Sequence, residues 1–222
     1  MLSVVMVAAL AATPQVVIEL RPEAGVSASG AQISTYDARL AKAVVGDLLG
    51  RGIPAAIVES GTAPEATRLA IRLNHHAIPA EWLKKGHGEA FYGFAMGIGQ
   101  SNPDTRTTIS CTRMIGTALR QAGEIPSLYR SFELPGLDQP LLDPALGIHY
   151  FKGDEGLVGR KGAALAVEIG IVSHSGDSER LASPVVVAGL SGAIASGIEE
   201  CFNPSDEADD ADAFVSEDIF DE

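Results

Sequence analysis

One carboxylate lies inside an otherwise apolar run in the last third of the sequence. Glu168 interrupts Ala163 to Val172, a stretch typical of a buried strand. A carboxylate in such a run is costly unless it has a partner or a function. At the carboxyl end of a strand it would face the crevice in which α/β sheets place their sites. The alternative is a structural ion pair with Arg160 or Lys161.

Two adjacent histidines, His75 and His76, follow a short apolar run from Leu69 to Leu73. Successive strand residues point to opposite faces, so only one of the two could share a crevice with Glu168. A neutral imidazole at a strand end is a common zinc ligand, whereas the alternative is a pair of exposed loop histidines. The other histidines show no ligand spacing and are expected to be structural or exposed: His87, His149 and His174.

Other catalytic patterns are missing from the sequence. No G-x-S-x-G nucleophile elbow occurs, and Gly93 to Gly97 lacks the Lys-Ser/Thr pair of a P-loop. The two cysteines, Cys111 and Cys201, form no CxxC pair. We expect them to be buried thiols, with a disulfide as the alternative.

The composition is that of one globular domain, since the 222 residues are 46% hydrophobic and 20% charged. Nine of the 29 acidic residues lie between Asn203 and Glu222, where no Lys or Arg occurs. The remaining 20 acidic residues are opposed by 16 Lys and Arg, so the net charge of the rest of the chain is −4. This mildly acidic part offers no cationic groove, and we therefore expect no nucleic-acid partner.

Apolar runs alternate with helical patterns along the chain. We expect strands at residues 16–20, 53–58, 69–73, 91–98, 147–151 and 163–172, and helices at residues 36–49, 107–122 and 184–202. This alternation predicts an α/β fold, a single-domain twisted, mostly parallel sheet with helices on both faces. The strands Val16 to Leu20 and Ala163 to Val172 are expected to lie in its interior.

Both ends differ from the domain, which we assign to residues 16–202. Residues 1–15 contain an apolar run too short to span a membrane, and we expect no membrane span. Ala9-Leu10-Ala11 resembles a signal-peptidase site, but no Lys or Arg precedes the run, which favours an apolar element packed on the domain. Residues 203–222 are expected to be a solvated acidic tail. Docking onto a protein partner is the alternative, through Phe214, Val215, Ile219 and Phe220.

Several motifs, in this order, resemble the zinc-dependent N-acetylmuramoyl-L-alanine amidases. They span about Val16 to Phe202 and comprise Gly93 to Met96, Ser110 to Gly123, Pro126-Ser127, Pro140 to Asp143, Gly147 to Phe151 and Ala166 to Val172. That family cuts the amide between muramic acid and the stem peptide of peptidoglycan. The last motif resembles the family's closing strand, so the resemblance implies that Glu168 takes the position of the catalytic glutamate.

The resemblance also implies a zinc site, which this sequence retains only in part. The family uses a histidine after the first strand, a glutamate at the start of the first helix and a histidine after a middle strand. His75 takes the last position and Thr35 takes that of the glutamate, while Leu20 to Gly25 contains no histidine. The alternative ligands of a rearranged site are Glu23 and Asp37.

A catalytic zinc needs three protein ligands and an open water position. We therefore expect a degenerate metal site, no cofactor, and an inactive amidase-like protein that binds peptidoglycan or serves as a structural component, for example of a phage particle. The alternative is an active amidase that cleaves the muramoyl–L-alanine bond with zinc in a rearranged site. The location is left open among the periplasm, the cell exterior and a virion.

Overall fold

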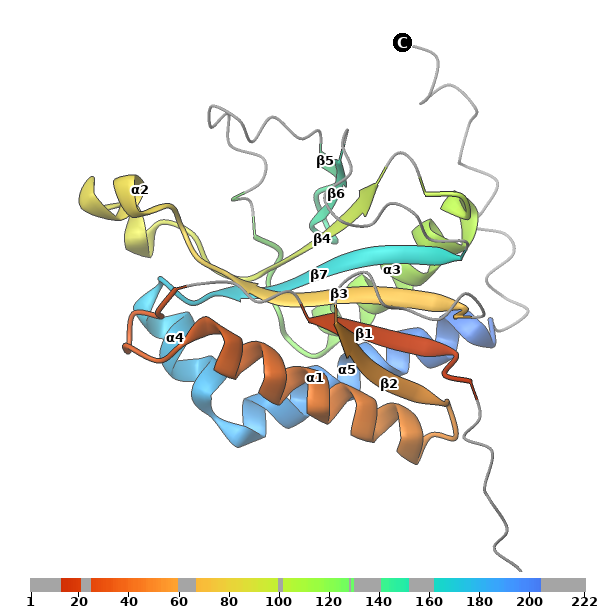
Figure 1. Ribbon diagram of the computed structural model, residues 1–222. Coiled ribbons are helices and arrows are strands. Elements are labelled where there is room, and N and C mark those ends of the chain that lie inside the picture. The colour runs from red at the N-terminus through yellow and green to blue at the C-terminus, as the bar shows by residue number, and fades with distance from the viewer. Residues whose placement is uncertain are drawn as a thin grey trace, which may run out of the picture.

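The computed structural model describes residues 13–20, 25–59, 67–99, 102–127, 129, 141–151 and 162–204. In this part of the chain, seven strands form one sheet in the order β2-β1-β3-β7-β4-β6-β5 (Figure 1). They are β1 (Val16–Leu20), β2 (Ala55–Glu59), β3 (Leu69–His76), β4 (Phe94–Gly99), β5 (Leu141–Asp143), β6 (Ile148–Phe151) and β7 (Ala163–Ile171). The pairs β4–β7 and β5–β6 are antiparallel, and the other four are parallel. The α/β class and the mostly parallel sheet are therefore confirmed, with β1 and β7 as interior strands.

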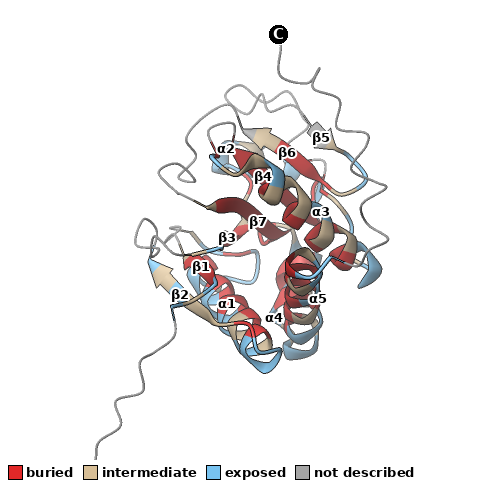
Figure 2. Ribbon diagram, turned by 90° about the vertical axis from the view of Figure 1, so that its right-hand side faces the viewer, coloured by how far each residue is buried: buried red, intermediate tan, exposed pale blue. Residues whose placement is uncertain are grey.

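The helices are distributed unevenly over the two faces of this sheet. They are α1 (Ile33–Gly50), α2 (Ala80–Lys84), α3 (Thr105–Gln121), α4 (Ser175–Ala182) and α5 (Pro184–Phe202), with a short 3-10 helix, η1 (His87–Glu89). Figure 2 shows α1, α3, α4 and α5 on one side. The short α2 follows β3, and its Trp82 packs against a small apolar cluster that includes Ile171 and Tyr129. These two residues also line a pocket on the other face. Helices on both faces were expected, but among the described elements the long ones cover a single face.

Alternation along the strands explains why one face carries the main core. Every second strand residue packs against α1, α3 and α5, including Leu69, Ile71 and Leu73 of β3 and Leu165, Val167 and Ile169 of β7. The opposite face has a smaller apolar cluster of Val17, Ala70, Ala164 and Ala166. Toward the carboxyl ends of the strands this second face becomes polar.

Local signals explain where two of the long helices begin. The side chain of Asp104 accepts a hydrogen bond from the backbone N–H of Thr107, which caps the start of α3. Pro184 occupies the first turn of α5, where its missing N–H is tolerated. α4 lies outside the elements predicted from the sequence, because its eight residues are too short and too polar to show a clear apolar period.

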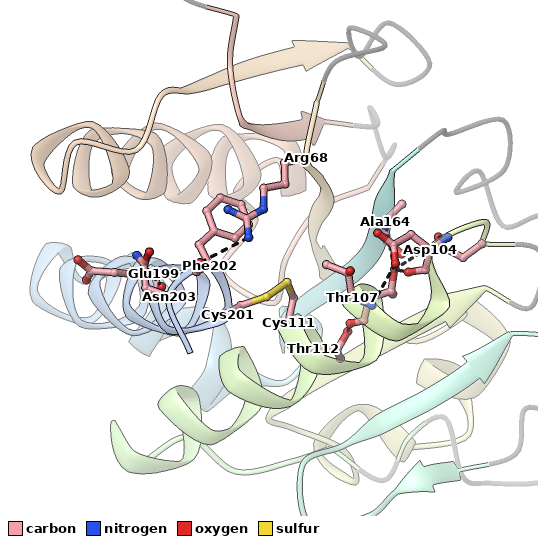
Figure 3. The surroundings of a disulfide bond; sticks show 12 residues. Arg68, Asp104, Thr107, Cys111, Thr112, Ala164, Glu199, Cys201, Phe202 and Asn203 are labelled. Carbon is pink, nitrogen blue, oxygen red and sulfur yellow. Dashed lines mark hydrogen bonds between the residues drawn. A yellow bond between two sulfur atoms is a disulfide. The ribbon is translucent and has the colours of Figure 1, made fainter. Parts of the chain in front are cut away.

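A disulfide joins α3 to α5 (Figure 3). Cys111 and Cys201 are separated by 90 residues in the sequence, and their Cα atoms are 4.9 Å apart, within the range that a disulfide requires. Gly197 allows the close approach of the two helices, because a Cβ there would collide with the backbone of Ile115. The prediction of two free thiols is therefore wrong, since the sequence gives no measure of the distance between two helices.

The last helix, α5, is long and apolar enough to cross a membrane by length and composition alone, with a mean hydropathy of 1.5. Half of it is buried inside the structure, where Leu190, Ile194 and Ile198 belong to the main core. Its end is fastened to the start of β3, because the guanidinium of Arg68 lies 3.9 Å from the ring centre of Phe202 (Figure 3). In this structure α5 behaves as a core helix of the domain.

Candidate binding site at the carboxyl end of the sheet

β3 continues through both of its histidines, so their side chains lie on opposite faces of the sheet. His75 lies on the helix-covered face, against α1. His76 lies on the other face, where it lines a pocket together with Glu168. The histidine that shares a pocket with Glu168 is therefore His76, and His75 is on the far side of the strand from it.

His75 and Asp37 form a buried pair between β3 and α1. Oδ1 of Asp37 accepts two hydrogen bonds from His75, one from the backbone N–H at 2.7 Å and one from Nδ1 at 2.8 Å. The two side chains are only 2% and 4% exposed. The two candidate metal ligands thus bind each other. Because Asp37 belongs to α1 and His75 to β3, the pair attaches α1 to the sheet.

A group of hydroxyls next to this pair holds the loop before α1. Oη of Tyr36 lies 3.1 Å from Oγ of Ser29 and 3.3 Å from Oγ of Ser178 on α4, and it donates to the backbone carbonyl of Ser178. Burial raises the pKa of Tyr36, but hydrogen bonds to Ser178, Ser27 and Ser29 outweigh it, so the pKa lies below its ordinary value. These hydroxyls connect the loop before α1 with α1 and α4. They are buried because they lie where these three segments meet.

The pocket on the other face lies where β3, β4 and β7 end or begin. Its lining consists of His76, Gly93, Ala95, Ser127, Tyr129, Glu168, Gly170 and Ile171. Glu168 is 6% exposed and lies opposite Ala95 in the antiparallel pairing of β7 with β4. The small side chains of this lining leave room for roughly one water molecule.

Asp177 of α4 holds the rim of the pocket in place. Its Oδ2 accepts hydrogen bonds from the backbone N–H groups of Gly93, at 3.0 Å, and Ile171, at 2.9 Å. Its Oδ1 lies 3.3 Å from Arg180, which also binds Glu124 through two hydrogen bonds. Burial lowers the pKa of Arg180, but the interactions with Glu124 and Asp177 raise it by more. The pKa therefore lies above its ordinary value, and the guanidinium keeps its charge. This network fixes the start of β4 relative to the end of β7.

Polar residues continue along the same face of β3. Arg72 and Asn74 alternate with the core residues Ile71 and Leu73, and both are buried. Asn74 lies opposite Glu168 in the parallel pairing of β3 with β7, and Arg72 lies opposite Glu19 of β1. The carboxyl half of this face therefore concentrates buried polar groups that an apolar sheet face does not need.

Aromatic rings connect the pocket with the segment that carries α2. The ring centres of His76 and Tyr129 are 4.7 Å apart, and Tyr129 packs edge-on against Phe91. Trp82 of α2 lies 6.4 Å from Phe91. These contacts give the pocket an aromatic wall on one side.

The structure brings together some of the residues predicted from the sequence and separates others. His75 and Asp37 meet, but across the sheet from Glu168. Glu23 lies outside the described residues, as do Arg160 and Lys161, the alternative partners of Glu168. His76 was not singled out as a ligand, although strict alternation along β3 already limited the crevice to one of the two histidines.

Three ligands for a zinc ion are not brought together in the part of the chain that the structure describes. No group of three His, Cys, Asp or Glu side chains there has a geometry that could hold a metal. The remaining histidines serve other contacts: Nδ1 of His174 caps α4 by accepting from Asp177, His87 packs on Trp82, and His149 is fully buried in β6. The described donor groups therefore do not fit the zinc site that the resemblance implied.

Comparison with known proteins gives a fold match without a sequence match. The sequence matches no protein-family model, and no curated protein is significantly similar to it. Among solved structures, the N-acetylmuramyl-L-alanine amidase Ami1 from Mycobacterium smegmatis is similar with a TM-score of 0.66 and 12% identity, over 87% of this chain and 99% of that chain. AmiC2 of Nostoc punctiforme, an N-acetylmuramoyl-L-alanine amidase, has a TM-score of 0.58 and 12% identity, over 86% and 98%.

A third similar structure is the catalytic domain of CwlV, an N-acetylmuramoyl-L-alanine amidase from Bacillus (Paenibacillus) polymyxa var. colistinus. It has a TM-score of 0.59 and 13% identity, over 86% of this chain and 99% of that chain. In all three cases this chain covers nearly the whole of the similar structure. The chain therefore has the fold of the cell-wall amidases, with a sequence only 12–13% identical to these three.

Proposed function

We propose that this chain is a peptidoglycan-binding protein of amidase fold that does not hydrolyse the wall. The fold supports this assignment, because the similar structures are N-acetylmuramoyl-L-alanine amidases. Fold similarity alone does not establish a reaction, so the argument rests on the site.

The pairing of His75 with Asp37 is the observation that carries the proposal. Two of the candidate zinc ligands bind each other on the helix-covered face, whereas Glu168 lines a pocket on the opposite face. Thr35 stands where the resemblance places a third ligand, and a threonine is a poor substitute for a carboxylate. Without a metal to activate water, Glu168 would have no hydrolytic partner there.

Retention of a built pocket supports binding rather than a purely structural role. Glu168, His76 and Tyr129 converge in a pocket whose rim is held by Asp177. A few convergent polar groups are the feature by which a binding site fixes the orientation of its ligand. The disulfide between Cys111 and Cys201 supports a location outside the reducing cytoplasm, where peptidoglycan lies.

A pull-down with purified sacculi, followed by analysis of the released fragments, tests the proposal. We expect the full chain to sediment with sacculi and to release no stem peptides. Release of stem peptides that Glu168→Gln abolishes would contradict the proposal. Absence from the pellet would also contradict it and favour a structural role, especially if the chain co-purifies with another protein.

One observation favours a second function, that of an active amidase with a rearranged zinc site. His76 and Glu168 line the same pocket, so one imidazole and one carboxylate are already on the same face. Metal analysis of the purified protein separates the two functions. One zinc per chain, lost in His76→Ala and kept in His75→Ala, would support the amidase, and no stoichiometric zinc is expected if the chain only binds.

A further inference from the structure

The exposed face of α3 carries a row of arginines. Arg106, Arg113 and Arg120 recur every seven residues, and all three are exposed. Seven residues are close to two helical turns, so the three side chains leave α3 on the same face. No Asp or Glu occurs between Thr105 and Gln121. In a chain with a net charge of −13, this arginine stripe is a local concentration of positive charge.

Two members of the arginine stripe keep donors that the described residues do not use. Arg113 forms no hydrogen bond or ion pair within the part of the chain that the structure describes. Arg120 donates one N–H to the backbone carbonyl of Glu124 at 3.1 Å, which leaves its other guanidinium donors for further contacts. The carboxylate of Glu124 binds Arg180 instead. Both arginines can therefore accept carboxylates from another segment.

Exposed apolar side chains lie where α3 ends. Ile125 follows shortly after the helix and is 49% exposed. Its carbonyl accepts a hydrogen bond from the N–H of Phe94, which places the start of β4 and the nearby Tyr92 against this turn. Tyr92 is 48% exposed. The two half-exposed side chains therefore lie on adjoining backbone beside the Arg120 end of α3, where a docking segment could cover them.

The acidic tail leaves the domain beside α3 (Figure 3). Cys201 is bonded to Cys111 of α3, and the described part of the chain ends shortly afterwards at Pro204. Residues 206–212 contain five acidic residues, and Phe214 follows them. Charge therefore precedes the apolar group along the tail. The same order holds along α3, where the arginine stripe precedes the exposed apolar side chains.

The lengths of the two segments also agree. From Cys111 to Ile125 the helix and turn cover roughly 20 Å, at about 1.5 Å per residue. The chain from Ser205 to Phe214 reaches about 33 Å when extended and has a mean end-to-end distance of about 17 Å when flexible. A tether whose mean length matches the span gives a high effective concentration at the target. Docking within one chain is therefore favoured over docking on a second copy.

We propose that the acidic tail docks along α3 of its own chain, with residues 206–212 on the arginine stripe and Phe214 on Ile125. Charge draws the tail to the helix, and the apolar contact fixes its far end. The inference goes beyond the proposed function and does not depend on it. A second copy presents an identical surface, so exchange of tails between copies would join subunits through the same contacts.

Cleavage of the folded full-length chain by chymotrypsin at Phe214, followed by mass spectrometry, tests this inference. A docked Phe214 is protected from the protease, so the cleavage rate reports the fraction of chains whose tail is released. Arg113→Glu/Arg120→Glu should be cut at least about fivefold faster than the wild type at low salt, because like charges then face the tail. At about 1 M NaCl the two rates should approach each other, since exposed ion pairs are screened.

Two matched controls separate this surface from general effects of charge and apolarity. Lys42→Glu/Lys84→Glu makes the same change of net charge at exposed positions of α1 and α2, and it should be cut at the wild-type rate. Ile125→Ser should be cut about two- to threefold faster than the wild type, because an apolar contact is lost. Val185→Ser, at a position of α5 that is 81% exposed, should not be affected.

The buried Phe94 reports any loss of fold in the same spectra, and the rates at Phe214 are compared while Phe94 stays intact. Equal rates for the wild type and the double arginine variant would overturn the inference. So would an equal acceleration in the double lysine variant, since the effect would then belong to net charge. Protection that increases with protein concentration would also overturn it, because a second copy would then supply the surface.

Discussion

Two neighbouring side chains of β3 serve different parts of the molecule. His75 points into the helix-covered core, where Asp37 accepts both its backbone N–H and its Nδ1. His76 points to the polar face and packs against the ring of Tyr129 at the pocket that Glu168 also lines. The strand alternation therefore assigns attachment of α1 to one histidine and a place in the candidate site to the other.

Replacement of Asp37 tests the structural part of this division. Asp37→Ala leaves two buried donors of His75 without an acceptor, and we expect the free energy of unfolding to fall by about 3 kcal/mol. Urea denaturation measures the change. Asp37→Asn, which keeps one side-chain oxygen, should lose less. Equal midpoints for Asp37→Ala and the wild type would show that the pair does not hold α1 to the sheet.

Gly170 gives a second test at the scale of one residue. Its φ is +76°, and a Cβ there would collide with Leu181. We expect Gly170→Ala to lower the free energy of unfolding by about 1–3 kcal/mol, through backbone strain and overpacking.

Gly46 is the matched control, because it lies in α1 with open space around its Cα. Gly46→Ala should stabilise the chain by about 0.5–1 kcal/mol, as expected for an exposed helix interior. Thermal unfolding of both variants measures the two changes in stability. A stabilising Gly170→Ala would mean that the backbone conformation at Gly170 differs from the one described.

At the scale of elements, the disulfide fastens the last helix to the middle of the chain. α5 packs on both α1 and α3, and Cys201 lies one residue before its end at Phe202. Because the bond closes 90 residues of chain, it restricts the unfolded state strongly. The link matters most for α5, whose apolar surface would otherwise be exposed if the helix detached.

Reduction of this bond should lower the free energy of unfolding by about 2–5 kcal/mol. For a chain of this size, that corresponds to a fall in Tm on the order of 10 °C. Calorimetry with and without reductant measures the shift. The Cys111→Ala/Cys201→Ala variant should show no response to reductant, and a wild-type chain that is equally indifferent would argue against the bond in solution.

At the scale of the whole molecule, charge is unevenly placed along the chain. Residues 205–222 lie outside the described part, and they contain all nine acidic residues of the tail. The last described helix ends at Phe202, and Asn203 closes it by donating its N–H to Glu199. The last described helix therefore ends before the acidic segment begins.

Deletion of residues 205–222 should leave Tm within about 2 °C of that of the full chain, because half of these residues are acidic and a segment so rich in like charges buries little apolar surface. We also propose that this tail docks on a basic, partly apolar surface of another subunit or protein, as its interleaved Phe and Ile residues indicate. Its association should weaken with salt without vanishing, since apolar contacts are not screened. Sedimentation of the full and truncated chains at several salt concentrations measures this, and identical assembly would reduce the tail to a solubilising extension.

Strong local signals made several elements predictable from the sequence by itself. The bounds of β1 and α5 match their predicted ranges, because a β-branched run and a proline-started apolar stretch leave few alternatives. β7 and the position of Glu168 within it were also predictable, since a nine-residue buried run has only one charged member. These features depend on residues close together in the chain.

The tertiary structure alone decided which groups meet. The choice between His75 and His76 depends on the register of β3 against β7, which includes an irregularity between Asn74 and His76. The disulfide depends on how closely α3 approaches α5, and the one-sided placement of the long helices depends on how the crossings between strands run. Each is a relation between distant segments, so the free energy that selects it comes from packing that no local pattern records.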